Sequence, residues 1–239
     1  MTALSEKLAQ LTPERRALLE RRLAARRPEG GIPPRAQDGP APLSFAQARL
    51  WFVQQLAPAE TAYNLALALR LRGPLDEAAM QTAFAALIDR HEALRMRCAQ
   101  GPDGAPVQTA DARPSLQRLD LSAAPDPEAA ARDALEEIAG RPHDLAAGAK
   151  RAGLARLGAE DHLLVIGLHH IAADRWSLGI LVRELAALYA AACRGEDAGL
   201  PQAPRMLDYA AWQHAAQGAE IETQLAWWRQ RLADAPALE

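Results

Sequence analysis

Hydrophobic residues recur along the chain at two spacings, and each spacing predicts one kind of secondary structure. Over residues 1–27, leucines recur every three or four positions, which predicts two short helices forming a helical lead-in or docking-like segment. Proline and glycine are frequent in residues 28–42, a composition typical of a linker. We therefore expect a compact domain over residues 43–239.

Inside this domain, segments with period-two alternation or short apolar runs predict strands, and segments with helical spacing predict helices. Strands are expected over 65–72, 94–98, 106–109, 116–121, 152–157 and 162–169, and helices are expected to start at Ser44, Asp76, Asp126 and Ser177, with two more over 206–216 and 220–232. The segment HLLVIGLH at 162–169 is apolar on both faces, which is typical of a central strand covered on both sides. The alternation of strands and helices predicts an α/β fold.

Composition narrows the classes of partner. Of the 239 residues, 49% are apolar and 24% are charged, with a formal net charge of -3, so no general attraction draws the chain to nucleic acid or an anionic membrane. Cys98 and Cys193 are far apart without ligand spacing, and we expect both to be reduced core residues. No apolar run approaches bilayer length, and the N-terminus lacks a signal-peptide layout. These features predict a cytoplasmic protein with no nucleic-acid or membrane partner.

The stretch HHIAADRWS, residues 169–177, ends the apolar strand and holds the strongest candidate for chemistry. Side chains alternate along a strand, so His169 and His170 should point to opposite faces and are poorly placed to share a metal ion. The other histidines and cysteines form no ligand cluster, so no metal site is predicted. A pair of satisfied core histidines is the alternative, but the strand-to-helix loop is a place where functional sites gather.

The chemistry that fits this loop is acid–base chemistry at His170. An imidazole side chain in water has a pKa of about 6.5 and exchanges a proton near neutrality. Asp174 is expected to hold the loop, by accepting backbone N–H bonds or by pairing with an arginine. Because no serine or cysteine lies in a recognisable nucleophile context, acyl transfer by direct attack is the reaction class that the residues favour.

Four motifs, in order, resemble those of one family. HHIAADRWS resembles the HHxxxDG motif of nonribosomal peptide synthetase condensation domains, which are relatives of chloramphenicol acetyltransferase. Residues 44–52, SFAQARLWF, resemble that family's SxAQxRLWF; residues 90–97, RHEALRMR, resemble its RHExLRTRF; and residues 208–213, DYAAWQ, resemble its DYAxWQ. SFAQARLWF and RHEALR are similar to the corresponding motifs of the subtype that joins an L-configured donor to an L acceptor. The resemblance implies a chloramphenicol-acetyltransferase-like lobe with a mixed β-sheet covered by helices.

The resemblance also implies roles for individual residues. His170 would be the catalytic residue, hydrogen-bonded to the attacking amine. The supporting or structural residues at the site would be His169, Asp174, Trp176 and Ser177. Arg175 stands where the family motif has glycine and is a candidate gate, and Arg90 and Arg95 are candidate salt-bridge partners of Asp174.

A complete condensation domain is about twice as long as this chain, so residues 43–239 resemble its N-terminal lobe with the C-terminal lobe absent. The implied activity is peptide-bond formation between substrates carried on the phosphopantetheine arms of donor and acceptor peptidyl carrier proteins. The C-terminal lobe of the same domain and an adjacent adenylation domain would be further partners, and the chain itself would bind no cofactor. We expect the isolated lobe to be inactive. Two alternatives stay open: a non-catalytic carrier-protein-binding or gating module, and a free-standing acyl-CoA-dependent acyltransferase.

Several residues depart from the family pattern or are open to a structural interpretation. His143 stands where phenylalanine is usual, and Lys150 stands where an apolar residue is usual and is interpreted as an edge-strand charge. In the first motif, Leu50, Trp51 and Phe52 are expected to pack. In the last motif, Tyr209 and Trp212 are expected in the core.

Overall fold

The computed structural model describes residues 31–36, 39–112, 115–233 and 235. Residues 35–239 belong to one compact unit, and residues 1–34 belong to another. The helical lead-in predicted over 1–27 lies outside the described residues. Of the predicted linker, only 31–36 and 39–42 are described. The fold and the site below therefore concern the second unit alone.

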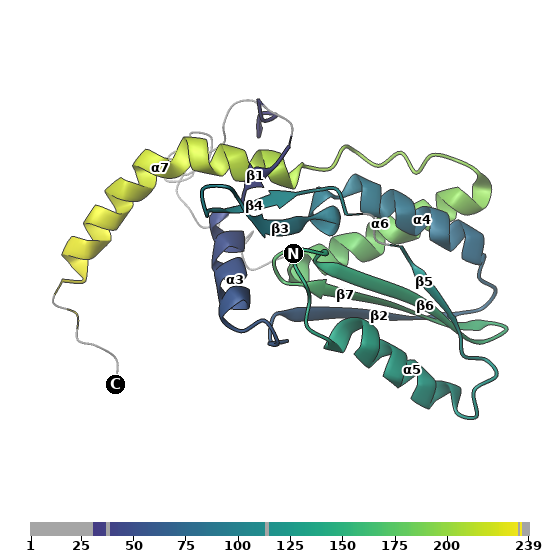
Figure 1. Ribbon diagram of the computed structural model, residues 1–239. Helices are drawn as coiled ribbons and strands as arrows, with labels where there is room; N and C mark the ends of the chain where they lie inside the picture. Colours follow the sequence, from purple (N-terminus) through teal and green to yellow (C-terminus); the bar gives the residue numbers. More distant parts are fainter. Residues whose placement is uncertain (1–30, 37–38, 113–114, 234, 236–239) are drawn as a thin grey trace, which may run out of the picture. The chain divides into compact units, whose positions relative to one another are not determined.

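The larger sheet has four strands in the order β2-β7-β6-β5 (Figure 1). Its strands are β2 (Asn64–Arg72), β7 (Asp161–His169), β6 (Lys150–Gly158) and β5 (Gln117–Asp120). β7 pairs antiparallel with both of its neighbours, whereas β5 pairs parallel with β6. The predicted mixed sheet is confirmed, and the apolar strand ending at His169 is central in it.

A smaller antiparallel sheet has the order β1-β4-β3, with β1 (Ala41–Pro42), β4 (Pro106–Thr109) and β3 (Arg97–Gln100). A tight turn joins β3 to β4, and Gly104 in this turn has a φ of 81°, which suits glycine. The predicted hairpin is confirmed. Its first strand begins later than predicted, because a 3-10 turn, η1 (Glu92–Arg95), comes before it.

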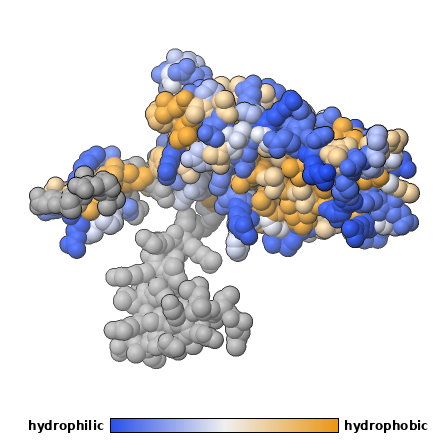
Figure 2. All heavy atoms as spheres, turned by 90° about the horizontal axis from the view of Figure 1, so that it is seen from below, coloured by the Kyte–Doolittle hydropathy of each residue, from blue (hydrophilic) through white to orange (hydrophobic). Residues whose placement is uncertain are grey.

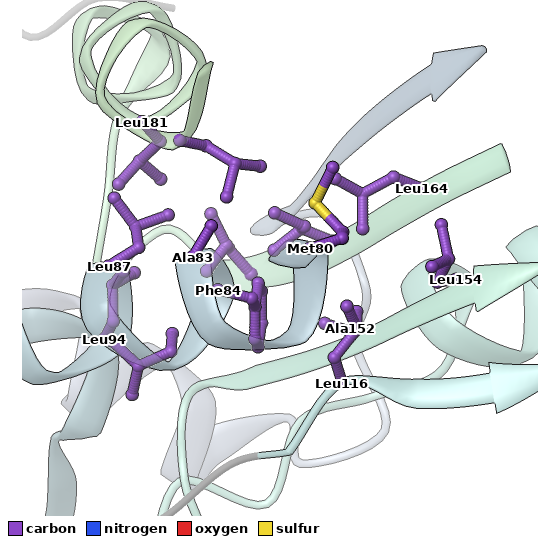
Figure 3. Packing of buried hydrophobic residues seen from close by; sticks show 14 of the residues in the cluster. Met80, Ala83, Phe84, Leu87, Leu94, Leu116, Ala152, Leu154, Leu164 and Leu181 are labelled. Atoms are coloured by element: carbon purple, nitrogen blue, oxygen red, sulfur yellow. The ribbon is translucent and has the colours of Figure 1, made fainter. Parts of the chain in front are cut away.

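Helices cover both faces of the larger sheet. On one face, α4 (Glu77–Arg90) and α6 (Arg175–Arg194) pack together (Figure 1), and Figure 3 shows Phe84 and Leu87 of α4 beside Leu181 of α6 in the main core. The other face is covered by α5 (Pro127–Leu135) and the single π-turn η2 (Glu136–Gly140). β7 alternates between the two cores: Leu164, Ile166 and Leu168 belong to the first, and Val165 contacts η2 on the second. This explains why its sequence is apolar throughout.

Side-chain caps fix where the helices begin. Ser44 caps α3 (Phe45–Leu56) in a capping box with Gln47, and Asp76 and Asp126 cap α4 and α5. The predicted cap of α6 was wrong by three residues: Asp174 is the N-cap, and Ser177 is its partner at the third helical position. Asp174 has extended backbone angles and accepts the N–H of Ser177, whereas Ser177 already lies within the helix.

The last helix and three side chains differ from prediction. α7 (Met206–Arg231) is one helix rather than two, because the glycine at 218 is tolerated within a helix and no proline interrupts it. Phe52 and Cys193 are exposed, because each lies on the outward side of its helix in the described unit. Trp51 is half-buried against the smaller core, as expected, and Cys98 is buried, which raises its thiol pKa to about 12.

α6 satisfies a length and hydropathy test for a membrane-spanning helix. This is weak evidence by itself, because core helices of soluble proteins pass the same test. Leu181 and Leu185 of α6 are buried in the main core against α4. We therefore interpret α6 as a core helix.

Candidate functional site

The two adjacent histidines lie where β7 ends beside β2. The His169 side chain is buried, with only 1% of its surface exposed, whereas His170 is exposed. The prediction that they point to opposite faces agrees with this difference in burial. His169 can therefore act only on its neighbours inside the protein, whereas His170 can contact a molecule at the surface.

Two hydrogen bonds define the protonation of His169. Its Nδ1 accepts the backbone N–H of Ile171 at 3.1 Å, so Nδ1 carries no proton. Its Nε2 lies 3.2 Å from Oε1 of Gln54, so Nε2 carries the proton and donates it. Burial, with a smaller contribution from His170, lowers the pKa of His169 to about 4. His169 is therefore neutral near pH 7, in a single tautomer.

The backbone around His170 is held from both sides. The N–H of His170 donates to the carbonyl of Tyr63 at 2.8 Å, which extends the pairing of β7 with β2. The N–H of Ala172 donates to the carbonyl of His169 at 2.9 Å and closes the turn. A fixed backbone thus presents an exposed imidazole, the arrangement required of a residue that positions a substrate or exchanges a proton with it.

Asp174 holds the start of α6. Its Oδ1 accepts the backbone N–H of Ser177 at 2.7 Å and the Ser177 hydroxyl at 2.6 Å, and its own N–H donates to that hydroxyl at 3.3 Å. These bonds from Ser177, and to a smaller degree His170, hold the pKa of the Asp174 carboxyl below its usual value. The predicted structural role through backbone N–H groups agrees with this geometry.

The predicted pairing of Asp174 with Arg90 or Arg95 is not seen in the described residues. Arg90 forms an ion pair with Glu184 at 2.7 Å, and Arg95 donates to the carbonyls of Ile88, Asp89 and Ala110. Both guanidinium groups are bound near the C-terminal end of α4. Arg95 donates to free backbone carbonyls there, and Arg90 pairs with Glu184 of the neighbouring helix α6. They are structural residues away from the histidine turn.

Arg175 and Trp176 open α6 beside the histidine turn, and both are exposed. Trp176 has 81% of its surface accessible, so in this unit it does not support the site by packing. The supporting role that the resemblance implied for Trp176 stays a prediction. His170, Arg175 and Trp176, which are close in sequence, are thus all exposed.

Sequence reasoning gave no site role to Gln54 or to His143, the two residues that contact His169 from inside the lobe. Gln54 and His143 both contact His169 and both line a pocket of about 600 Å³ between the end of α3, β3 and residues 142–146. Gln54 follows Gln47 by seven residues, which places both polar side chains on the buried side of α3. That spacing of two glutamines in an apolar helix was the available signal.

His143 is an unusual neighbour for His169. The centroids of the two rings lie 6.1 Å apart in an edge-to-face arrangement, and neither ring nitrogen of His143 has a hydrogen-bond partner within the described part of the chain. Burial, then the charge of Arg151, then His169, lower the pKa of His143 to about 4. His143 thus behaves as a neutral ring, in line with the aromatic residue usual at this position. Over the described ranges, no three His, Cys, Asp or Glu side chains gather in a way that could hold a metal ion.

Comparison with known proteins gives one family. Residues 37–239 match the family model described as Condensation domain. Phosphinothricin tripeptide synthetase PhsC of Streptomyces viridochromogenes is 42% identical over 247 residues, which cover 99% of this chain and 23% of that protein. Cyclosporin synthetase simA of Tolypocladium inflatum is 42% identical over 219 residues, which cover 89% of this chain and 1% of that protein. The chain spans a minor part of these relatives.

Solved structures agree with this match. The starter condensation domain of rhizomide synthetase RzmA superimposes with a TM-score of 0.74 at 25% identity, over 81% of this chain and 48% of that one. The first condensation domain of the calcium-dependent antibiotic synthetase, solved with a substrate analogue, gives a TM-score of 0.69 at 27% identity, over 84% of this chain and 49% of that one. The chain therefore corresponds to about half of each solved chain.

Proposed function

Because this chain belongs to the condensation-domain family, we propose that it supplies the catalytic-histidine half of a domain that forms peptide bonds. The observation that carries the proposal is the exposed His170 on a turn whose backbone and neighbouring ring are both fixed. One of the two relatives compared above is a tripeptide synthetase, and its name agrees with this chemistry.

In the proposed reaction, the amine of an acceptor aminoacyl group attacks the thioester carbonyl of a donor. A C–N bond forms and the C–S bond breaks, the amine loses one proton, and the departing phosphopantetheine thiolate gains one. His170 accepts a hydrogen bond from the amine and orients it, and it is placed to take the proton as the bond forms. Holding two tethered reactants in attack geometry contributes about 7–11 kcal/mol in the best cases.

The partners follow from the same proposal. Donor and acceptor peptidyl carrier proteins would bring the substrates, an adjacent adenylation domain would load one of them, and the other half of the domain would complete the tunnel around His170. We propose that the complex works in the cytoplasm. Arg175, exposed beside His170, is the proposed gate, since its guanidinium offers several donors in a rigid fork to a substrate carbonyl.

The test is His170→Ala in a complete domain that contains this chain, supplied with loaded donor and acceptor carrier proteins. We expect product formation to fall about 100-fold or more, with an unchanged melting temperature, because His170 is exposed and its backbone bonds do not need the ring. His169→Ala is the matched comparison, and it should lower stability as well as activity because it empties a buried, hydrogen-bonded position. Near-normal turnover by folded His170→Ala would remove His170 from the mechanism, whereas a folded wild-type domain that forms no product would support a binding or gating module instead.

A further inference from the structure

Gln54 belongs to α3, far in sequence from the HHIAADRWS motif, and its side chain contacts the buried histidine of that motif. Its side chain is buried, with 5% of its surface exposed. Its Nε2 donates to the carbonyl of Pro58 at 3.0 Å, and this bond turns the amide so that Oε1 faces His169. The orientation of Gln54 is therefore set by the turn that follows α3.

The contact with Gln54 decides what His169 can do. Because Nε2 of His169 keeps its proton and donates a hydrogen bond to Oε1 of Gln54, Nδ1 is unprotonated and can accept a hydrogen bond from the N–H of Ile171. That second bond ties the ring to the backbone on the far side of His170. A chain of three hydrogen bonds therefore runs from the Pro58 carbonyl, through Gln54 and His169, to the turn that carries His170.

We propose that Gln54 is a positioning residue, which holds His169 in the Nε2-protonated tautomer and thereby fixes the turn that presents His170. This role rests on the proposed function for its effect on rate. It does not make Gln54 a catalytic residue, because Gln54 is buried and acts only through His169.

A carboxylate at position 54 would reverse this arrangement. A negative charge beside Nε2 stabilises the imidazolium and raises the pKa of His169 from its low value. An imidazolium carries a proton on both nitrogens, so Nδ1 would no longer accept from Ile171 and the turn would lose that bond. The other titratable groups facing this ring are His143 and Tyr63, at ring-centroid distances of 6.1 and 6.2 Å, and the adjacent His170.

The experiment compares Gln54→Glu and Gln54→Met with Gln55→Glu. Gln55 is the matched control, because it is the next residue of the same helix, lines the same pocket and is exposed. The first measurement is the ¹⁵N shift of each ring nitrogen of His169 against pH in the 239-residue chain. Wild type and Gln55→Glu should stay in the Nε2-protonated form down to about pH 5, as the pKa of about 4 requires, whereas Gln54→Glu should titrate at higher pH.

The second measurement is turnover against pH in the complete domain. Gln54→Met should lower kcat about 10- to 100-fold with little change in KM, because the reacting geometry is loosened while substrate binding is not. Gln54→Glu should lose activity through an additional acid limb, as pH falls through the raised pKa of His169, beyond any loss at acid pH that wild type and Gln55→Glu share. A purely structural role would not create that limb.

The outcomes separate the two proposals. An active wild-type domain whose Gln54→Glu variant keeps the wild-type ¹⁵N titration or the wild-type pH profile would overturn the positioning role alone. The same effect from Gln55→Glu would also overturn it. A wild-type domain that forms no peptide bond would overturn the proposed function and the positioning role with it.

Discussion

Lys150 carries an amine into the core between β6 and α4. Only 7% of its surface is exposed, and among the described residues its Nζ has no hydrogen-bond partner and lies 4.4 Å from the centroid of the Phe84 ring. Burial lowers its pKa to about 7. The interpretation of Lys150 as an edge-strand charge was wrong, because its side chain is buried against Phe84 of α4 instead of reaching solvent. Burying this amine lowers the free energy of unfolding relative to an apolar side chain at the same position.

Replacing Lys150 with methionine should stabilise the protein, and the gain should depend on pH. At pH 6 the amine is charged in both the folded and the unfolded state, so the full desolvation penalty is present and we expect a gain of about 2–4 kcal/mol. Between about pH 7 and 10.5 the unfolded state binds more protons than the folded state, so wild-type stability rises with pH and the gain shrinks. Urea unfolding at pH 6 and pH 9.5 measures it. Equal gains at both pH values would show that Lys150 is solvated in the folded state.

At the scale of single residues, sequence reasoning located the histidine turn but not the side chains that hold it in place. The roles of His170 and Asp174 follow from their place after a strand and before a helix, which is local information. The contact of His169 with Gln54 joins residues 115 positions apart, so it depends on how α3 packs on β7. The burial of Lys150 depends on how α4 packs over the start of β6, which periodicity does not contain. Tertiary packing therefore decides what the local pattern leaves open.

Close packing of η2 on β7 requires glycine at one position of the central strand. A Cβ at Gly167 would lie 2.4 Å from the carbonyl oxygen of Ile138, which belongs to the backbone of η2. At Gly153 on β6, an added Cβ would lie 2.5 Å from Cδ1 of Ile138, the end of a flexible side chain. The two glycines face the same residue, one against its backbone and the other against its side chain.

We expect Gly167→Ala to destabilise the protein by about 2–3 kcal/mol, because η2 must move away from the sheet. Gly153→Ala should cost about 1 kcal/mol or less, because Ile138 can change rotamer. Thermal unfolding of both variants measures the difference. Equal costs would mean that η2 shifts easily and does not fix the spacing of this layer.

The types of the secondary-structure elements were predicted better than their bounds. The central strand, the β3–β4 hairpin and the capped helices α3, α4 and α5 follow from alternation and from Ser or Asp before a helical pattern. The start of α6 was misplaced, since Asp174 and Ser177 both suit an N-cap and only their geometry separates them. The continuity of α7 was missed because a glycine in a polar stretch predicts a break.

The described unit leaves apolar surface uncovered. Figure 2 shows areas of hydrophobic residues bordered by hydrophilic ones on the face that it views. The exposed large hydrophobic side chains include Phe45, Phe52 and Leu56 of α3. The match covers 48% and 49% of two solved condensation-domain chains, so about half of each has no counterpart in the matched part of this chain. Apolar patches of this kind are typical of surfaces that another part of a protein covers.

We therefore expect the pure 239-residue chain to form no peptide bond, because the groups that would enclose the substrates opposite His170 are supplied by the other half of the domain. The measurement is mass-spectrometric detection of the condensation product with both loaded carrier proteins. The complete domain under the same conditions is the positive control. Product above the uncatalysed background from the chain alone would show that one half suffices.

The exposed indole of Trp176 gives this protein an optical reporter at the place where the proposed substrates would meet. Indole emission moves to shorter wavelength when water leaves its surroundings, and Trp176, six residues after His170 in the sequence, starts with 81% of its surface exposed. The other four tryptophans, Trp51, Trp212, Trp227 and Trp228, would contribute background emission, which comparison with a Trp176→Phe variant subtracts. The arrival of a partner at this face can then be followed by fluorescence in real time, without attaching a label.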